Sequence, residues 1–243
     1  MSDLSKPFDI AVIGAGIAGA SVASELASRA RVILIEQESQ PGYHTTGRSA
    51  AVYSPIYGPQ PIRAVTRASL AFFTNPPEGF ADHPLLSPID AAFVARADQT
   101  ASLDAMEAEL ADTSTVRRVD AAELRRHLPL LREGYALGAI WDSGTSEIDV
   151  SALHQGYLRG FKAAGGTVLT NAPVSALTRI AEGWQIDTGQ GGLTAKVVVN
   201  AAGARSEQAD AERQAARSRL FCLTSAPMGQ FRHIAERRVS GSS

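Results

Sequence analysis

The sequence has few of the residues that build disulfides, metal clusters or basic nucleic-acid surfaces. One cysteine in 243 residues, Cys222, excludes an internal disulfide and a cysteine-based metal cluster. A net charge of -2 and a pI near 6.2 give no basic footprint, so we expect no nucleic-acid partner. The histidines are scattered without metal-ligand spacing, and we expect surface or capping residues and no metal site: His44, His83, His127, His154 and His233.

The chain also lacks a run of about twenty strongly apolar residues, which a membrane-spanning helix requires. Its most apolar stretch, residues 10–27, is interrupted by Glu25 and by several serines and glycines. Residues 1–8 are polar and lack the basic and apolar regions of a secretory signal. We therefore expect no stable membrane insertion and a cytoplasmic protein.

Glycines, by contrast, form a pattern near the N-terminus. An apolar strand at 9–13 leads into G-x-G-x-x-G at 14–19, and a second apolar strand, 32–35, ends at Glu36. This pattern is typical of a βαβ dinucleotide cradle, in which glycines allow a tight turn and a close approach of the pyrophosphate to the helix N-terminus. A glycine-rich turn in another kind of βαβ unit is the alternative.

Glu36 is placed to bind the sugar of such a ligand. It follows Gly19 by seventeen positions, where an acid accepts hydrogen bonds from the two hydroxyls of an adenosine ribose. A 2′-phosphate would meet its negative charge, so NADP is disfavoured. A solvated residue at the end of a strand is the alternative.

The middle of the chain predicts helices separated by loops. Residues 37–61 are rich in Gly, Pro, Thr and Ser and predict a long loop, and apolar residues then recur at helical spacing from Ile62 to Phe72. Asn75-Pro76-Pro77 ends that helix. Further elements are expected as follows: a strand at 91–96, a helix at 103–110, a short helix capped by Asp120 and Glu123, and a helix capped by Asp149 and closed by Gly165-Gly166.

The last part predicts a strand, a small antiparallel meander and a return strand, at 167–169, 174–180, 184–188 and 193–199. Residues 197–199 are apolar on both faces, as in a central parallel strand. The expected fold class is therefore α/β. In it, a nucleotide domain built from both ends of the chain encloses an inserted segment at about 76–148.

Three separated motifs, 14–21, 42–51 and 198–204, resemble the flavin-dependent D-amino-acid oxidase and glycine or sarcosine oxidase superfamily. Further similarity within 72–88 and 153–160 is greatest to D-arginine dehydrogenase-like enzymes. The resemblance covers about the first 204 positions.

It implies a Rossmann-like FAD-binding domain at 1–75 and 149–204. A partial α+β substrate domain is implied at 76–148, and an atypical tail at 205–243.

The resemblance implies FAD as the cofactor. It places these residues against it: Gly14, Ala15, Gly16, Ile17, Ala18, Gly19, Glu36, Gln37, Thr46, Arg48, Ser49, Ala50, Ala51, Val174, Ala201 and Gly203. Arg48 is a fixed cation suited to phosphate, and a solvated loop charge is its alternative. Tyr57 is implied to cover the substrate, and an aromatic anchor beside Tyr53 is the alternative. No catalytic residue emerges.

The implied reaction oxidises the carbon that bears the amine of a small molecule, a D-amino acid or related amine, to an imine. Two departures disfavour D-arginine itself. Val52 stands where that branch has a histidine, and Ala91, beside Asp90, stands where it has a glutamate for the cationic side chain. A small or neutral D-amino acid is expected instead. Oxidase or dehydrogenase, and the oligomeric state, are left open.

The tail, 205–243, carries seven arginines against four acids and no convincing strand, so it is expected to be frameshifted or replaced sequence. The alternative is an exposed helix at about 206–219 with a disordered end. A second function therefore stays open, that of a catalytically inactive nucleotide-binding fragment. An NAD-binding reductase is less favoured, because it would have no use for the motif at 46–51.

Overall fold

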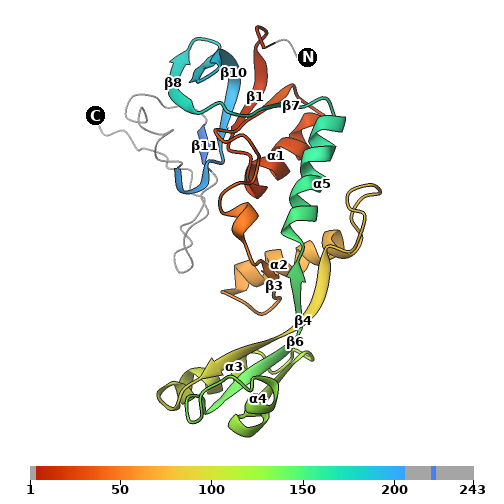
Figure 1. Ribbon diagram of the computed structural model, residues 1–243, viewed down its shortest axis with the longest axis vertical. Coiled ribbons are helices and arrows are strands. Elements are labelled where there is room, and N and C mark those ends of the chain that lie inside the picture. The colour runs from red at the N-terminus through yellow and green to blue at the C-terminus, as the bar shows by residue number, and fades with distance from the viewer. Residues whose placement is uncertain (1–3, 206–219, 223–243) are drawn as a thin grey trace, which may run out of the picture. The chain divides into compact units, whose positions relative to one another are not determined.

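The computed structural model describes residues 4–205 and 220–222, and the chain divides into two compact units. The first unit takes residues up to 46 and from 157 on, and the second takes 47–156. Each unit contains its own β-sheet (Figure 1). The second unit is wider than the predicted insertion at 76–148, since it also includes residues 47–75 before it and 149–156 after it.

The first unit is built on a seven-stranded sheet in the order β7-β2-β1-β10-β9-β8, with β11 beside β10. β1, β2, β7 and the C-terminal half of β10 run parallel, whereas β8, β9 and the N-terminal half of β10 form an antiparallel meander. The α/β expectation, including the meander and the return strand, is confirmed. The strands are β1 Phe8–Ile13, β2 Val32–Ile35, β7 Thr167–Leu169, β8 Val174–Ile180, β9 Gly183–Thr188, β10 Gly191–Asn200 and β11 Leu220–Cys222.

Alternate residues of the central strands face two separate cores. On one face Val12 and Leu34 pack with the alanines of α1 (Ile17–Ala27) and with Phe161 of α5 (Val150–Ala163). On the other face Ile33 packs with apolar side chains of the meander, including Trp184 and Ile186. Both faces are covered, which explains why the central strands are apolar throughout.

The carboxylate of Asp9 fastens β1 to its neighbours. It accepts hydrogen bonds from Lys196 Nζ at 2.8 Å, on β10, and from the Arg31 backbone N–H at 2.9 Å, just before β2. The Lys196 ammonium, followed by the Arg31 N–H, lowers the pKa of Asp9 below its usual value. The Asp9 side chain therefore adds contacts with β10 and with the residue before β2 to the backbone ladders of β1.

Helix α5 begins and ends where the sequence predicts. Asp149 Oδ1 accepts the Ala152 N–H at 2.7 Å, Gly165 has φ +84°, and the Gly166 N–H returns to the Phe161 carbonyl at 2.9 Å. The surface or capping role expected for His154 is wrong. Its position on α5 is buried, with 3% of the residue exposed.

The second unit is built on a four-stranded antiparallel sheet in the order β3-β6-β4, in which β5 also pairs with β6. Figure 1 shows α3 and α4 beside this sheet, and α3 packs on it through Leu103 and Ile140. Its elements are β3 Val52–Tyr53, α2 Gln60–Thr74, β4 Leu86–Ala95, α3 Thr100–Glu109, β5 Val116–Asp120, α4 Ala121–His127 and β6 Gly138–Ile148.

The sequence did not reveal β6, because its C-terminal half is polar. Asp142, just before this half, is fully buried, and its two oxygens accept hydrogen bonds from the Thr115 hydroxyl, the Gly144 N–H and the Thr145 hydroxyl at 2.8–2.9 Å. A buried carboxylate with three donors is satisfied locally, so a strand that contains it remains compatible with the core.

The expectation that the tail holds no strand is wrong, since Leu220–Cys222 pairs in parallel with the end of β10. The helix proposed for 206–219 lies outside the described residues. No helix in the described part of the chain has the length and apolar character needed to cross a membrane. Within residues 4–205 and 220–222, no group of three or more His, Cys, Asp or Glu side chains is placed to hold a metal ion.

Candidate dinucleotide site

The turn after β1 brings three backbone segments together at positions where no side chain fits. Gly14 has φ +94°, and a Cβ on it would lie 2.6 Å from the Ala201 carbonyl oxygen. A Cβ on Gly19 would overlap the Gly14 carbonyl oxygen. Gly14 therefore provides the turn and Gly19 the close packing of α1 on β1, the two roles that the motif predicts.

The N-terminus of α1 opens at this turn. Gly16 is the N-cap residue and has no side chain to satisfy the first N–H groups of the helix. The Ile17 N–H is instead bound by Thr46 Oγ1 at 2.9 Å, and a Cβ on Gly16 would lie 3.1 Å from that oxygen. Thr46 can still donate its own hydrogen, so the site presents a hydroxyl and a helix N-terminus to an anion.

A cavity of about 370 Å³ lies over this turn, within the first unit. Its walls come from the ends of β1, β2 and β10, the start of α1 and β8, and the segment after β2. The lining residues are Ile13, Gly14, Gly16, Ile17, Ala18, Ile35, Glu36, Gln37, Gly42, Tyr43, His44, Thr45, Thr46, Ala172, Val174, Ala201, Ala202, Gly203 and Ala204.

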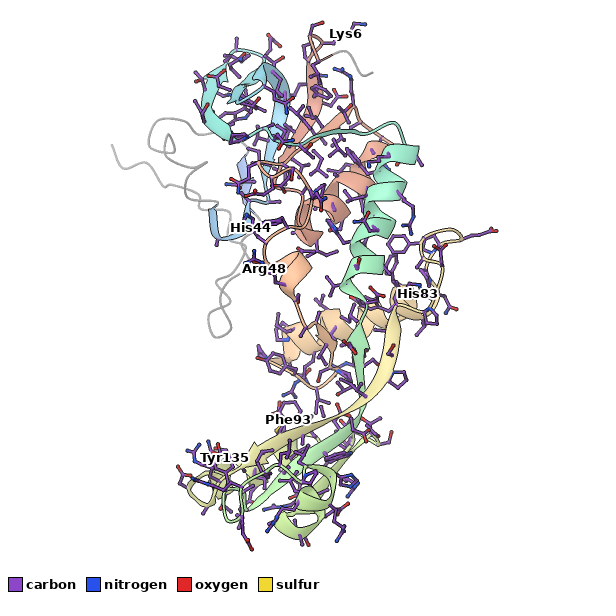
Figure 2. All side chains as sticks on the ribbon, in the orientation of Figure 1. Lys6, His44, Arg48, His83, Phe93 and Tyr135 are labelled. Carbon is purple, nitrogen blue, oxygen red and sulfur yellow. The ribbon has the colours of Figure 1, made fainter. Side chains whose placement is uncertain are left out.

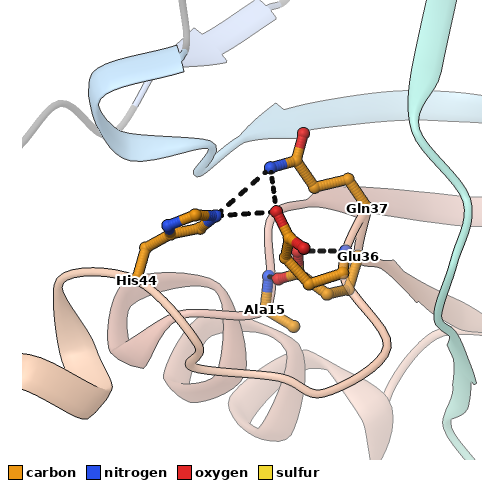
Figure 3. Close-up of polar contacts among 5 residues, drawn as sticks. Ala15, Glu36, Gln37 and His44 are labelled. Atoms are coloured by element: carbon orange, nitrogen blue, oxygen red, sulfur yellow. Dashed lines mark hydrogen bonds and ion pairs between the residues drawn. The ribbon is translucent and has the colours of Figure 1, made fainter.

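Glu36 lines this cavity although it is 8% exposed. Its Oε2 accepts the Ala15 N–H at 2.9 Å, and its Oε1 accepts the Glu38 N–H at 3.0 Å (Figure 3). Two backbone donors thus orient a carboxylate that retains lone pairs toward the cavity. This geometry is compatible with the ribose-binding role proposed for Glu36.

Most of the residues implied by resemblance line this cavity, including Glu36, Gln37, Thr46, Val174, Ala201 and Gly203. Two glycine-motif positions do not. Ala15 is fully buried and binds Glu36 through its N–H, and Gly19 packs against Gly14.

The remaining predicted residues belong to the second unit: Arg48, Ser49, Ala50, Ala51 and Tyr57. They are not among the residues that line this cavity. Their roles toward the flavin and the substrate therefore stay predictions.

Sequence reasoning missed His44 as a site residue. Its side chain is 44% exposed, as expected of a surface histidine, yet it lines the cavity beside Tyr43. Both lie inside the motif at 42–51, and their place in that motif was the signal that could have identified them.

The residues present fit a dinucleotide such as FAD. The cradle has glycine where a side chain would block the pyrophosphate, a helix N-terminus beside a hydroxyl, and an oriented carboxylate on the cavity wall. These are the donors and acceptors that a pyrophosphate and an adenosine ribose require.

The family described as FAD dependent oxidoreductase (DAO) matches residues 9–237. The chain belongs to this family. The match extends past Ala204, where the similarity seen in the sequence ended. FAD is the family's cofactor, which confirms the cofactor prediction.

Curated relatives support the same placement. L-2-hydroxyglutarate dehydrogenase of Salmonella houtenae is 30% identical over 76% of this chain and 44% of its own length. The tRNA 5-methylaminomethyl-2-thiouridine biosynthesis bifunctional protein MnmC of Shewanella amazonensis is 31% identical over 82% of this chain and 30% of its own length. The chain therefore spans less than half the length of these relatives.

Solved structures share the fold. Glycine oxidase from Geobacillus kaustophilus has a TM-score of 0.74 at 22% identity, covering 85% of this chain and 58% of that one. L-proline dehydrogenase from P. horikoshii has a TM-score of 0.71 at 21% identity, covering 86% and 56%. At this identity the likeness concerns the fold. Similarity to D-arginine dehydrogenase in particular is not among these findings.

Proposed function

We propose that the chain is the FAD-binding part of an oxidoreductase that oxidises the CH–NH₂ or CH–NH group of a D-amino acid or related amine to an imine. The observation that carries the proposal is the cavity over the glycine turn, with Glu36 held on its wall, in a chain of the FAD dependent oxidoreductase family. When bound, the flavin supplies the electron sink for such an oxidation.

The chain's own residues hold and orient the cofactor in this proposal. Glu36 binds the ribose hydroxyls, while Thr46 and the N-terminus of α1 bind the pyrophosphate. Val174, at the start of β8, meets the adenine, while Ala201 and Gly203, after β10, flank the ribose and pyrophosphate; all three line the cavity. A pocket of this kind excludes water from the cofactor and fixes its position.

The substrate side is proposed to lie in the second unit, with Tyr57 as a covering group. The Tyr57 residue is 49% exposed and therefore accessible to a ligand. Val52 and Ala91 offer no charge for a cationic substrate, and Asp90 is exposed. This composition favours a small or neutral substrate.

A hydroxy acid is the second candidate substrate class. The relative that acts on L-2-hydroxyglutarate matches three quarters of the chain, and its name specifies a CH–OH rather than a CH–NH₂ group. The third reading is an inactive nucleotide-binding fragment, which the short coverage of the relatives supports.

The test begins with the visible spectrum of the purified protein. Flavin bands support the cofactor assignment, and NAD binding without flavin would contradict it. The flavin-loaded protein is then assayed with an artificial electron acceptor against matched panels of D-amino acids, small amines and 2-hydroxy acids. Turnover confined to the amines supports the proposal, turnover confined to hydroxy acids favours the second candidate, and flavin binding without any turnover favours the fragment.

A further inference from the structure

One wall of the dinucleotide cavity is a single loop that is fastened at both ends. The loop, residues 37–46, leaves β2 and returns to the start of α1. At its first end the Glu38 carbonyl accepts the Asn171 N–H at 2.9 Å, and at its last end Thr46 binds Ile17. The cavity is lined by Gln37 and by residues 42–46 of this loop, so the loop's position determines the shape of the site.

One carboxylate oxygen joins the two ends of this loop. Glu38 Oε1 lies 2.8 Å from His44 Nε2 and accepts the Gln37 side-chain amide at 2.9 Å (Figure 3). The Gln37 amide nitrogen also lies 3.5 Å from His44 Nε2. Because an ionised carboxylate oxygen only accepts hydrogen bonds, His44 Nε2 must carry the hydrogen in this contact.

This contact continues a chain of hydrogen bonds from the glycine turn. The Ala15 N–H binds Glu36, Glu36 binds the Glu38 N–H, and the Glu38 side chain binds His44. The carboxylate proposed to meet the ribose and the ring that lines the cavity are therefore connected through one residue. The contact restrains the loop before a ligand binds, so the loop has less conformational entropy to lose when it closes on the ligand.

We infer that Glu38 and His44 form a clasp that closes the loop 37–46 over bound FAD. Both are positioning residues, because they act on the loop that lines the cavity and not on reacting atoms. The inference depends on FAD binding and not on the substrate class.

The variants are His44→Ala, Glu38→Ala and the double variant, each titrated with FAD by flavin fluorescence. Alanine can neither donate nor accept, and the loss of this partly exposed hydrogen bond predicts that His44→Ala raises the Kd by about twofold to fivefold. If the two residues act as one clasp, the double variant is no weaker than His44→Ala alone. Glu38→Ala by itself removes a negative charge near the ligand, so its Kd is interpreted only within this cycle.

The matched control is His83→Ala. His83, in the second unit (Figure 2), pairs with Asp149 at the same distance, 2.8 Å, and is also partly exposed. It does not line the cavity, so its substitution should leave the Kd for FAD unchanged.

A second readout separates the clasp from a charge effect. Amide hydrogen exchange of residues 39–45 is measured with saturating FAD. In both single variants the amides of residues 39–45 should exchange faster than in the parent, while exchange in the β8–β9 meander should be unchanged. The inference is overturned if His44→Ala has the parent's Kd and exchange, if the Kd effects of the two substitutions add, if His83→Ala has the same effect, or if the parent itself binds no FAD.

Discussion

Replacing Glu36 by alanine is the most informative perturbation of the site. The substitution removes two charge-assisted hydrogen bonds within the protein, to the Ala15 and Glu38 N–H groups, and the two proposed to the ribose. Charge-assisted hydrogen bonds are worth about 1.5–3 kcal/mol each. Taking the lower figure for the two ribose bonds gives about 3 kcal/mol, or roughly a 150-fold weaker Kd for FAD.

The glutamine variant refines this prediction. Its amide oxygen can replace one acceptor, whereas its NH₂ group would face one of the two backbone donors. We therefore expect Glu36→Gln to fall between the parent and Glu36→Ala. Glu182→Ala is the matched control, since Glu182 is exposed in the turn between β8 and β9 of the same unit.

The measurement is a flavin-fluorescence titration of each purified variant, with circular dichroism as the check on folding. A folded Glu36→Ala that binds FAD within about twofold of the parent would show that Glu36 does not bind the ribose. A folded variant that fails to bind FAD but gains NADP would instead support the charge-exclusion argument, since only a 2′-phosphate profits from the lost carboxylate.

Three further predictions follow from the fold and the length of the chain. Gly14→Ala should abolish FAD binding or soluble expression. Its control is Gly79→Ala, where φ is a similar +74° and no atom lies within 4 Å of the added Cβ, so this substitution should cost only backbone strain. Thermal melts with and without FAD compare the two variants. Asp149→Ala should lower the free energy of unfolding by about 1 kcal/mol at pH 7. The Ala152 N–H, and then His83, lower the pKa of Asp149, so this difference should persist above the unfolded value and vanish as pH falls through the lower native value, as urea titrations at several pH values would show. The 243-residue chain, supplied with FAD, should oxidise D-amino acids far more slowly than a full-length relative, and comparable turnover with an artificial acceptor would refute the fragment reading.

The cradle was predictable because its signals are local. Gly14 and Gly19 are required by contacts between backbone segments, and the apolar strands on either side of α1 are buried on both faces. Helix α2 was equally readable, since its spacing and the prolines after it act within a few residues.

The second sheet was not predictable in the same way. β6 is a strand because β4 lies on one side of it and β3 and β5 on the other, and these partners are far apart in the sequence. One of the three donors to its buried Asp142 is the hydroxyl of Thr115, more than twenty positions away. The β-propensity of a segment does not depend on partners so distant in the sequence, so the pairing of β6 could not be predicted from its own residues.

The site divides into parts that differ in how freely they can vary. Gly14 and Gly19 face carbonyl oxygens of the backbone, which cannot move without displacing β1 or β10, so any side chain there opposes the fold itself. Glu38 and His44 meet through partly exposed side chains on a loop, where a substitution changes only a contact. We therefore expect the rigid turn to determine whether a dinucleotide binds, and substitutions in the loop to change its affinity at small cost to stability.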